Sequence, residues 1–389
     1  MDRRGRGLGN HRARRPGRHA VGHRPRRRTP TPTAADHRRR GGDDHDGPLA
    51  RTARAWPRRR PLHAGPTSAP RGDRAYGDGE GTAHAAVRWR WGWDPNVQAE
   101  DEEQGIMRLH TFRAMGTEVS VVLDDHQSID RVRRFFAAQE RRFSRFDERS
   151  DLSRLNADPS EEVTLDPEMA RILGLAAELR SRTGGLVDPA VGAAVRGWGY
   201  DADFDEIAGT RRRASSTSSP VPRWWIDGDL LVRPTPTILD LGGIAKGHTC
   251  DLAVEEGLAL VASAGGDVRS AHPEAQVELV DPWDAATLTV TIGCGALATS
   301  SRTRRRWTTD QGDAHHLIDP RTGRPADTPV LSATAWTATA VEAEAAAKAI
   351  LIRGADGLAW AERQSWIRSA LVVWHDGSVY ATVGWEVAA

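Results

Sequence analysis

The chain has 389 residues, with 54 Lys and Arg against 53 Asp and Glu, a formal net charge of +1 and 39% hydrophobic residues. It has no run of about 18 apolar residues and no apolar segment of about 7 to 15 residues near its start, so we expect an unexported, soluble, cytoplasmic protein without a membrane segment. The two cysteines, Cys250 and Cys294, are too few for a disulfide framework or a cysteine-based metal site.

Charge is divided unevenly along the chain. Residues 1–100 carry 23 basic and 10 acidic side chains, a net +13, and the remaining residues carry 31 and 43, a net −12. From Met1 to about Gln104 the chain is rich in Arg, Gly, Pro, His and Asp without apolar periodicity, which predicts that residues 1–104 are a disordered leader. This leader is either an arginine arm that binds nucleic acid or translated sequence upstream of a start at Met107. Its lack of lysine favours the second interpretation, so we do not expect a nucleic-acid partner.

Regular periodicity begins after this leader, in residues 107–389. The sequence TEVSVVL, Thr117 to Leu123, alternates as a half-buried strand does. Apolar residues then recur at roughly helical spacing and predict a helix with a mostly buried aromatic stripe, formed by Ile129, Val132, Phe135, Phe136, Phe143 and Phe146.

A second helix is predicted from Pro167 to the glycines Gly184 and Gly185, because proline favours a helix start and glycine a helix end. Its apolar positions are Met169, Ile172, Leu173, Ala176 and Leu179. The polar segment 203–222 predicts a surface loop or linker between two lobes. Beyond it, strand-like runs at 277–280, 288–292, 332–336 and 370–374 alternate with helical runs at 248–262 and 341–353. The mixture predicts an α+β fold of mixed sheets and packed helices.

The most informative segment is ILDLGGIAKGHTCDLAVEEG, residues 238–257. An apolar run ends in Asp240, and Gly242 and Gly243 lead into a predicted helix that carries Lys246. Glycines let the backbone approach a phosphate closely, a helix N-terminus presents free N–H groups, and lysine adds a point charge. Alone, the same pattern also fits a tight turn and a solvated lysine.

Further motifs make the pattern specific. They are SAGGDVR at 263–269, ALATSSR at 296–302, HHLIDPRTG at 315–323, MGT at 115–117, RFSRFDERSDLSRLN at 142–156, GGLVDPAVG at 184–192 and WGY at 198–200. With them the sequence resembles, from about Arg113 to Trp385, the ApbE family of FAD:protein FMN transferases, whose two-lobed domain is related to the T-fold. The resemblance implies transfer of FMN from FAD to a threonine hydroxyl of an acceptor flavoprotein, with release of AMP.

The resemblance also implies which side chains line an FAD site. They are Met115, Phe146, Leu186, Val187, Asp188, Asp240, Lys246, Asp267, Thr299, Ser300 and Ile318. From the residues alone, Met115 and Phe146 are equally compatible with a core, Asp188 with a turn and Asp240 with a helix cap.

The reaction implied is attack of the acceptor oxygen on the FMN-side phosphorus of the pyrophosphate. Positioning and charge neutralisation dominate such phosphoryl displacements, and a general base adds about 10²- to 10⁴-fold. The family pattern implies His316 as that base, with His315 as the weaker candidate. The alternative for His316 is a strand histidine bonded to Asp319 or to backbone.

The implied metal site departs from the family pattern. In relatives an Asp and a Thr one helical turn apart bind Mg²⁺ with a backbone carbonyl, and the corresponding positions here are Glu344, Lys348 and the carbonyl of Gly243. Glutamate can ligate Mg²⁺, whereas an ammonium can only donate. Lys348 therefore either forms an i,i+4 pair with Glu344 or places a catalytic ammonium where the metal would lie. The second interpretation is supported by composition, because Lys246 and Lys348 are the only lysines among the 54 basic residues.

We therefore predict an FAD:protein FMN transferase, with magnesium as a conditional cofactor. Two alternatives stay open: hydrolysis of FAD to FMN and AMP, and a flavin-binding protein without transferase activity. Neither the acceptor protein nor the oligomeric state follows from the sequence.

Overall fold

The computed structural model of the chain describes residues 87–88, 107–215, 219–283 and 287–385. Most of the predicted leader 1–104 therefore lies outside the described residues. One part of it is described, the short strand β1 (Val87–Arg88), which pairs antiparallel with β10 (Gln276–Val280). The leader thus includes a strand that its lack of apolar periodicity did not predict.

An eight-stranded sheet forms the centre of the fold, and each neighbouring pair in it is antiparallel. Its order is β19 (Val379–Ala381), β18 (Ile367–Trp374), β17 (Val330–Thr337), β12 (Ala296–Ser301), β9 (Asp267–Ser270), β8 (Val261–Ala264), β3 (Thr117–Leu123) and β2 (Arg108–Ala114). Strand β3 has the predicted bounds, because its alternating Val119, Val121 and Leu123 are buried on one face.

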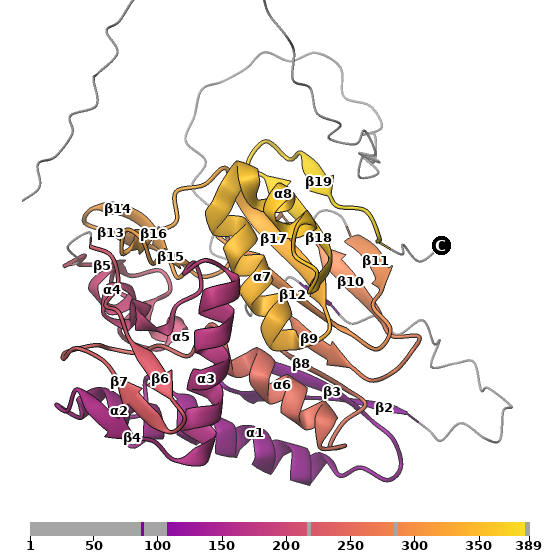
Figure 1. Cartoon of the computed structure of the whole chain (residues 1–389). Coiled ribbons are helices and arrows are strands. Elements are labelled where there is room, and N and C mark those ends of the chain that lie inside the picture. Colours follow the sequence, from indigo (N-terminus) through magenta and orange to yellow (C-terminus); the bar gives the residue numbers. More distant parts are fainter. Residues whose placement is uncertain (1–86, 89–106, 216–218, 284–286, 386–389) are drawn as a thin grey trace, which may run out of the picture. The chain divides into compact units, whose positions relative to one another are not determined.

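Helices cover one face of this sheet (Figure 1). They are α1 (Ile129–Phe143), α6 (Ala245–Glu255), α7 (Ala340–Arg353) and α8 (Gly357–Glu362). The opposite face packs on the hairpin of β10 and β11 (Thr287–Thr291), where Val277 and Val290 meet Val122 and Leu297.

A second layer of helices and short strands packs on α6 and α7. It contains α2 (Asp151–Ala157), α3 (Pro167–Arg182), α4 (Gly192–Gly197), α5 (Phe204–Ile207) and the sheet β4 (Glu162–Thr164), β7 (Leu230–Val232) and β6 (Trp225–Asp227). Helix α3 starts at Pro167 as predicted, because Asp166 caps it by accepting from the amides of Glu168 and Met169. The five predicted apolar positions of α3 are all buried.

The remaining strands form two small sheets. One has the order β14 (Gly312–His315), β13 (Arg306–Thr309) and β5 (Arg211–Arg212), and the other pairs β15 (Ile318–Asp319) with β16 (Arg324–Pro325). Among the described strands, the pair β13–β5 is the parallel one, so mixed pairing is confined to this small sheet. The predicted α+β class is confirmed.

Three sequence predictions need correction. Helix α1 ends at Phe143, so Phe146 lies beyond it and is 39% exposed rather than part of a buried stripe. The helical run 248–262 ends at Glu255, because Gly257 adopts φ +66° and residues from Val261 enter strand β8.

The third correction concerns the segment 203–222, which is not simply a surface loop. It contains α5 and β5, and Ile207 and Ala214 are buried in a cluster with Trp198 and Trp307. Apolar side chains at these two positions give the segment a core contact that its polar composition concealed.

Candidate functional site

One cavity, of about 760 Å³, lies where the turn between β2 and β3, the C-terminal end of α1 and the N-terminal end of α6 meet α7 and the segment 299–318. All the positions predicted for FAD and for the metal line it, as do His316 and Lys348, whereas His315, the weaker candidate base, does not. The positions that line it are Met115, Phe146, Leu186, Val187, Asp188, Asp240, Gly243, Lys246, Asp267, Thr299, Ser300, His316, Ile318, Glu344 and Lys348. The structure therefore brings together residues separated by more than 230 positions in the chain.

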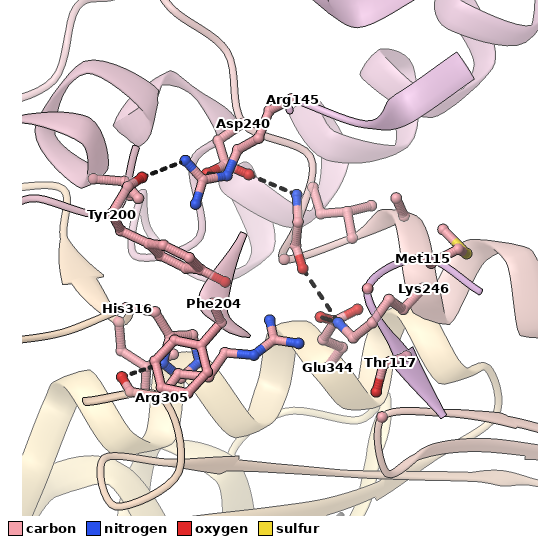
Figure 2. A pocket seen from close by; sticks show the side chains of 18 of the residues that line it. Met115, Thr117, Arg145, Tyr200, Phe204, Asp240, Lys246, Arg305, His316 and Glu344 are labelled. Atoms are coloured by element: carbon pink, nitrogen blue, oxygen red, sulfur yellow. Dashed lines mark hydrogen bonds and ion pairs between the residues drawn. The ribbon is translucent and has the colours of Figure 1, made fainter. Parts of the chain in front are cut away.

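The rim of the cavity includes a strained turn. Met115 and Gly116 are the two central residues of the β2–β3 hairpin and have φ of +55° and +64°. Such a pair fits the twist of a hairpin, and a non-glycine residue held at positive φ costs about 1–3 kcal/mol. Met115 is thereby held over the cavity as well as against two core clusters (Figure 2).

One close glycine contact and one carboxylate bring α6 and α7 together. A Cβ on Gly247 would lie 2.9 Å from backbone atoms of Ala340, so glycine permits the helices to cross at backbone distance. The carboxylate of Asp251 on α6 accepts from the amides of Ala340 at 2.7 Å and Val341 at 3.0 Å, and so fixes the start of α7. This crossing places Lys246 of α6 beside Glu344 of α7.

A buried charge cluster results at the crossing (Figure 2). Lys246 Nζ lies 2.8 Å from Glu344 Oε1 and 3.1 Å from Asp267 Oδ2, and it also donates to the Gly242 carbonyl at 3.2 Å. Lys348 Nζ donates to the same Glu344 Oε1 at 2.9 Å and to the Gly243 carbonyl at 3.3 Å. One carboxylate oxygen thus accepts from two ammonium groups.

The pKa values in this cluster follow from burial and charge. Burial alone would raise the pKa of Glu344, but the two lysines outweigh it and hold that pKa well below its ordinary value. Burial also acts against the charged form of Lys246, but Glu344 and Asp267 raise its pKa above the ordinary range. For Asp267, burial and the charge of Glu344 raise the pKa to about 6, against the opposing effect of Lys246.

The candidate metal ligands in this cluster do not form a site for a divalent cation. The predicted ligands are Glu344 and the Gly243 carbonyl, and the ammonium of Lys348 already lies between them. An ammonium has no lone pair for a cation and repels it. Within the described ranges, no group of three or more His, Cys, Asp or Glu side chains is arranged to hold a metal ion.

The two adjacent histidines differ in how many of their ring nitrogens are hydrogen-bonded. His316 Nδ1 lies 3.3 Å from the Arg305 carbonyl, and because a carbonyl only accepts, Nδ1 carries the proton and Nε2 keeps its lone pair. His315 uses both nitrogens, with Nε2 on the Ala326 carbonyl at 3.2 Å and Nδ1 accepting from the Leu317 amide at 3.3 Å. His316 is therefore the better base of the two.

The alternative proposed for His316 is realised in part. Its ring and its amide both contact the backbone of Arg305, whereas the Asp319 carboxylate is paired with Arg321. Burial and the nearby Arg305 lower the pKa of His316 well below its ordinary value, so the imidazole is neutral at pH 7.

Two of the predicted aspartates, Asp240 and Asp188, are held by the protein. Asp240 accepts from the Gly242 amide at 2.7 Å and pairs with Arg145 Nε at 3.2 Å. Both oxygens of Asp188 are likewise engaged: Oδ1 accepts from Trp224 Nε1 at 2.8 Å and Oδ2 pairs with Arg180 Nε at 2.8 Å. The turn interpretation of Asp188 holds, since its Oδ1 also accepts from the Ala190 amide at 2.9 Å. Asp240 is not a helix cap, because α6 has Ile244 at its N-cap and no side chain caps it.

Four arginines that line the cavity were not predicted, namely Arg113, Arg145, Arg304 and Arg305. The Arg145 guanidinium lies 4.2 Å from the ring centroids of both Phe146 and Tyr200 and donates to the Tyr200 carbonyl at 2.7 Å. The Arg305 side chain extends from beside His316 toward Glu344 (Figure 2). Arg145 lies inside the motif RFSRFDERSDLSRLN, whereas Arg305 lies in the stretch between the motifs ALATSSR and HHLIDPRTG. Membership of a motif, or nearness to one, was the available signal.

This chain is similar in sequence to a family of known proteins. The model of the ApbE family matches residues 115–371. The FAD:protein FMN transferase of Rhodobacter capsulatus is 31% identical over 236 residues, which are 56% of this chain and 45% of that protein. The enzyme of the same name from Treponema pallidum is 28% identical over 290 residues, 67% of this chain and 80% of that protein. The chain thus matches less than half the length of the first relative and four fifths of the second.

Solved structures of two ApbE proteins have a similar fold. The crystal structure of the ApbE protein from Thermotoga maritima has a TM-score of 0.60 at 25% identity and covers 72% of this chain and 97% of its own. The flavin transferase ApbE from Vibrio cholerae has a TM-score of 0.57 at 21% identity, with the same coverage of 72% and 97%. No helix in the described part of the chain is long and apolar enough to span a membrane.

Proposed function

Because the chain belongs to the ApbE family, we propose that it transfers the FMN part of FAD to a threonine hydroxyl of an acceptor flavoprotein and releases AMP. One observation carries the proposal: a single cavity gathers every residue implied for FAD binding and for catalysis. Its volume of about 760 Å³ lies in the range of about 300–1,000 Å³ that small-molecule sites occupy.

The chemistry proposed is one displacement at phosphorus. The acceptor Oγ forms a bond to the FMN-side phosphorus, and the bond from that phosphorus to the bridging oxygen breaks, so AMP leaves with that oxygen. The hydroxyl proton passes to His316 Nε2, the ring nitrogen that the Arg305 carbonyl leaves unprotonated. AMP leaves as a stable phosphate anion, so the protein does not need to protonate it.

Positioning is the main contribution that we assign to the other residues. Leu186, Val187 and Ile318 are at most 5% exposed and give the cavity an apolar wall suited to a flavin ring. The rings of Phe146 and Tyr200, each with its centroid 4.2 Å from the Arg145 guanidinium, add an aromatic surface to the cavity wall. Charge on the pyrophosphate is met by the lysine cluster at the crossing of α6 and α7.

The test is incubation of the full chain with FAD and an acceptor. The probe is a flavoprotein domain with a threonine in an exposed segment, and its Thr→Ala variant is the control. Mass spectrometry should show one covalent FMN on the threonine protein and none on the control, with one AMP released per adduct. AMP without an adduct would replace the proposal with FAD hydrolysis, and intact bound FAD would replace it with flavin binding alone.

A further inference from the structure

The two lysines of the charge cluster differ in how many N–H groups they have left. An ammonium has three N–H groups. Lys246 meets three acceptors: the Gly242 carbonyl, Glu344 Oε1 and Asp267 Oδ2, at 3.2, 2.8 and 3.1 Å. All of its donors are therefore used inside the protein.

Lys348 meets two acceptors among the described residues, Glu344 Oε1 at 2.9 Å and the Gly243 carbonyl at 3.3 Å. One N–H remains. The side chain is 17% exposed and lines the cavity. Lys348 can thus donate to a phosphate oxygen without losing an existing contact, whereas Lys246 cannot.

Resting on the proposed function, we propose that the Lys348 ammonium takes the place of a divalent cation in this protein. Two N–H groups hold it on Glu344 and the Gly243 carbonyl, and the third donates to a pyrophosphate oxygen of FAD. Lys246 is then a positioning residue, whose three contacts fix Glu344 and Asp267 around that ammonium. FAD binding and AMP release consequently do not require Mg²⁺.

Space around the ammonium explains why lysine is retained here in a chain whose other basic residues, apart from Lys246, are all arginine. A Cβ on Gly243 would lie 3.0 Å from Lys348 Cε and 3.5 Å from Nζ, so the backbone packs directly against the end of the side chain. A compact ammonium fits that space, and a planar guanidinium with five donors does not match its two acceptors.

The test measures FAD affinity by flavin fluorescence, without an acceptor, in excess chelator and in excess Mg²⁺. Wild type should bind FAD equally in both. Lys348→Met, which keeps the length but not the charge, should bind about 10- to 100-fold more weakly in both, as expected for a lost hydrogen bond to a charged group. Lys348→Thr should lose affinity in chelator and regain it with Mg²⁺, because it frees Glu344 and the Gly243 carbonyl.

Arg171→Met is the matched control, since Arg171 is a cation on the exposed surface of α3, 51% exposed, and paired only loosely with Glu255 at 3.8 Å. It should bind FAD as wild type does, and melting temperatures confirm that each variant is folded. Wild-type affinity that collapses in chelator and returns with Mg²⁺ would overturn the proposal, and so would wild-type affinity in Lys348→Met.

Failure of this inference is separable from failure of the proposed function. Covalent FMN formed by wild type only with Mg²⁺ would overturn the role of Lys348 and leave the transfer standing. Chelator-resistant, Lys348-dependent FAD binding without AMP release or adduct would support the role of Lys348 and overturn the transfer. Absence of FAD binding by wild type under both conditions would overturn both.

Discussion

Replacing Glu344 by glutamine tests whether the charge cluster stabilises the fold. The Glu344 side chain is 3% exposed, and its Oε1 accepts from Lys246 and Lys348 at 2.8 and 2.9 Å. In Glu344→Gln two buried ammonium groups share one neutral amide, and removing one partner of a buried ion pair costs about 3–5 kcal/mol. Asp267 remains for Lys246, so we expect a value near the lower end.

Urea unfolding at pH 7 measures this loss. With a denaturant slope of about 3 kcal/mol per M, the transition midpoint should fall by about 1 M or more with the slope unchanged. Glu178→Gln is the control, since Glu178 forms an exposed i,i+4 pair with Arg182 on α3 and should cost at most about 0.5 kcal/mol. A Glu344→Gln midpoint within about 0.3 M of wild type would refute the view that this carboxylate holds two ammonium groups together.

Four further predictions concern the proposed base, its pH dependence and two single contacts. His316→Gln should lower acceptor-dependent AMP release by about 10²- to 10⁴-fold without changing FAD affinity, and a loss below about threefold would contradict its role as base. Burial, Arg305, His315 and Lys348 lower the pKa of His316. The rate of AMP release by wild type should therefore stay nearly constant from about pH 7.5 to 6, and a pH–rate profile with a midpoint near about 6.5 would oppose this. Gly243→Ala should displace the Lys348 ammonium and weaken FAD binding, measured by flavin fluorescence, about tenfold. The melting temperature should hardly change, because the displaced atoms are the end of a flexible side chain. Unchanged FAD binding would count against the close packing at Gly243. Asp251→Asn should lower the free energy of unfolding, measured by urea titration, by about 1–3 kcal/mol, because it weakens the hydrogen bonds to the first amides of α7. An unchanged unfolding midpoint would show that α7 does not need this cap.

Local patterns predicted those elements whose periodicity and end signals agree. Strand β3 alternates, with Val119, Val121 and Leu123 buried on one face, and α3 combines proline at its first position, an aspartate cap and a regular apolar stripe. In the run 248–262 the periodicity and the end signals did not agree, because short apolar stretches rich in Ala, Leu and Val are equally compatible with a helix and with a buried strand. Gly257 decides between them, since its positive φ ends α6 before β8 begins.

The sequence predicted the site residues that lie in backbone motifs. It missed those whose long side chains extend into the cavity from other parts of the fold. The glycines before α6 and the segment 315–323 indicated the cavity, because turns and helix starts have sequence signals. Arg145 and Arg305 gave no such signal, since the direction of a long side chain depends on neighbours such as Tyr200 that are distant in sequence. The cap that Asp251 provides to α7 likewise joins residues 89 positions apart.

The same separation along the chain affects when the site can form. Lys246 and Glu344 are 98 positions apart, so the charge cluster requires closure of a long loop, which is among the slower steps of folding. A chain still being synthesised, at about 5–20 residues per second, lacks α7 until nearly its whole length has emerged. On the proposed function, FAD would bind only to chains in which α7 has formed. At about 100 times its dissociation constant it would stabilise them by about 2.7 kcal/mol over incomplete or misfolded ones. Flavin supply would in this way act as a late selection for correctly folded copies of the protein.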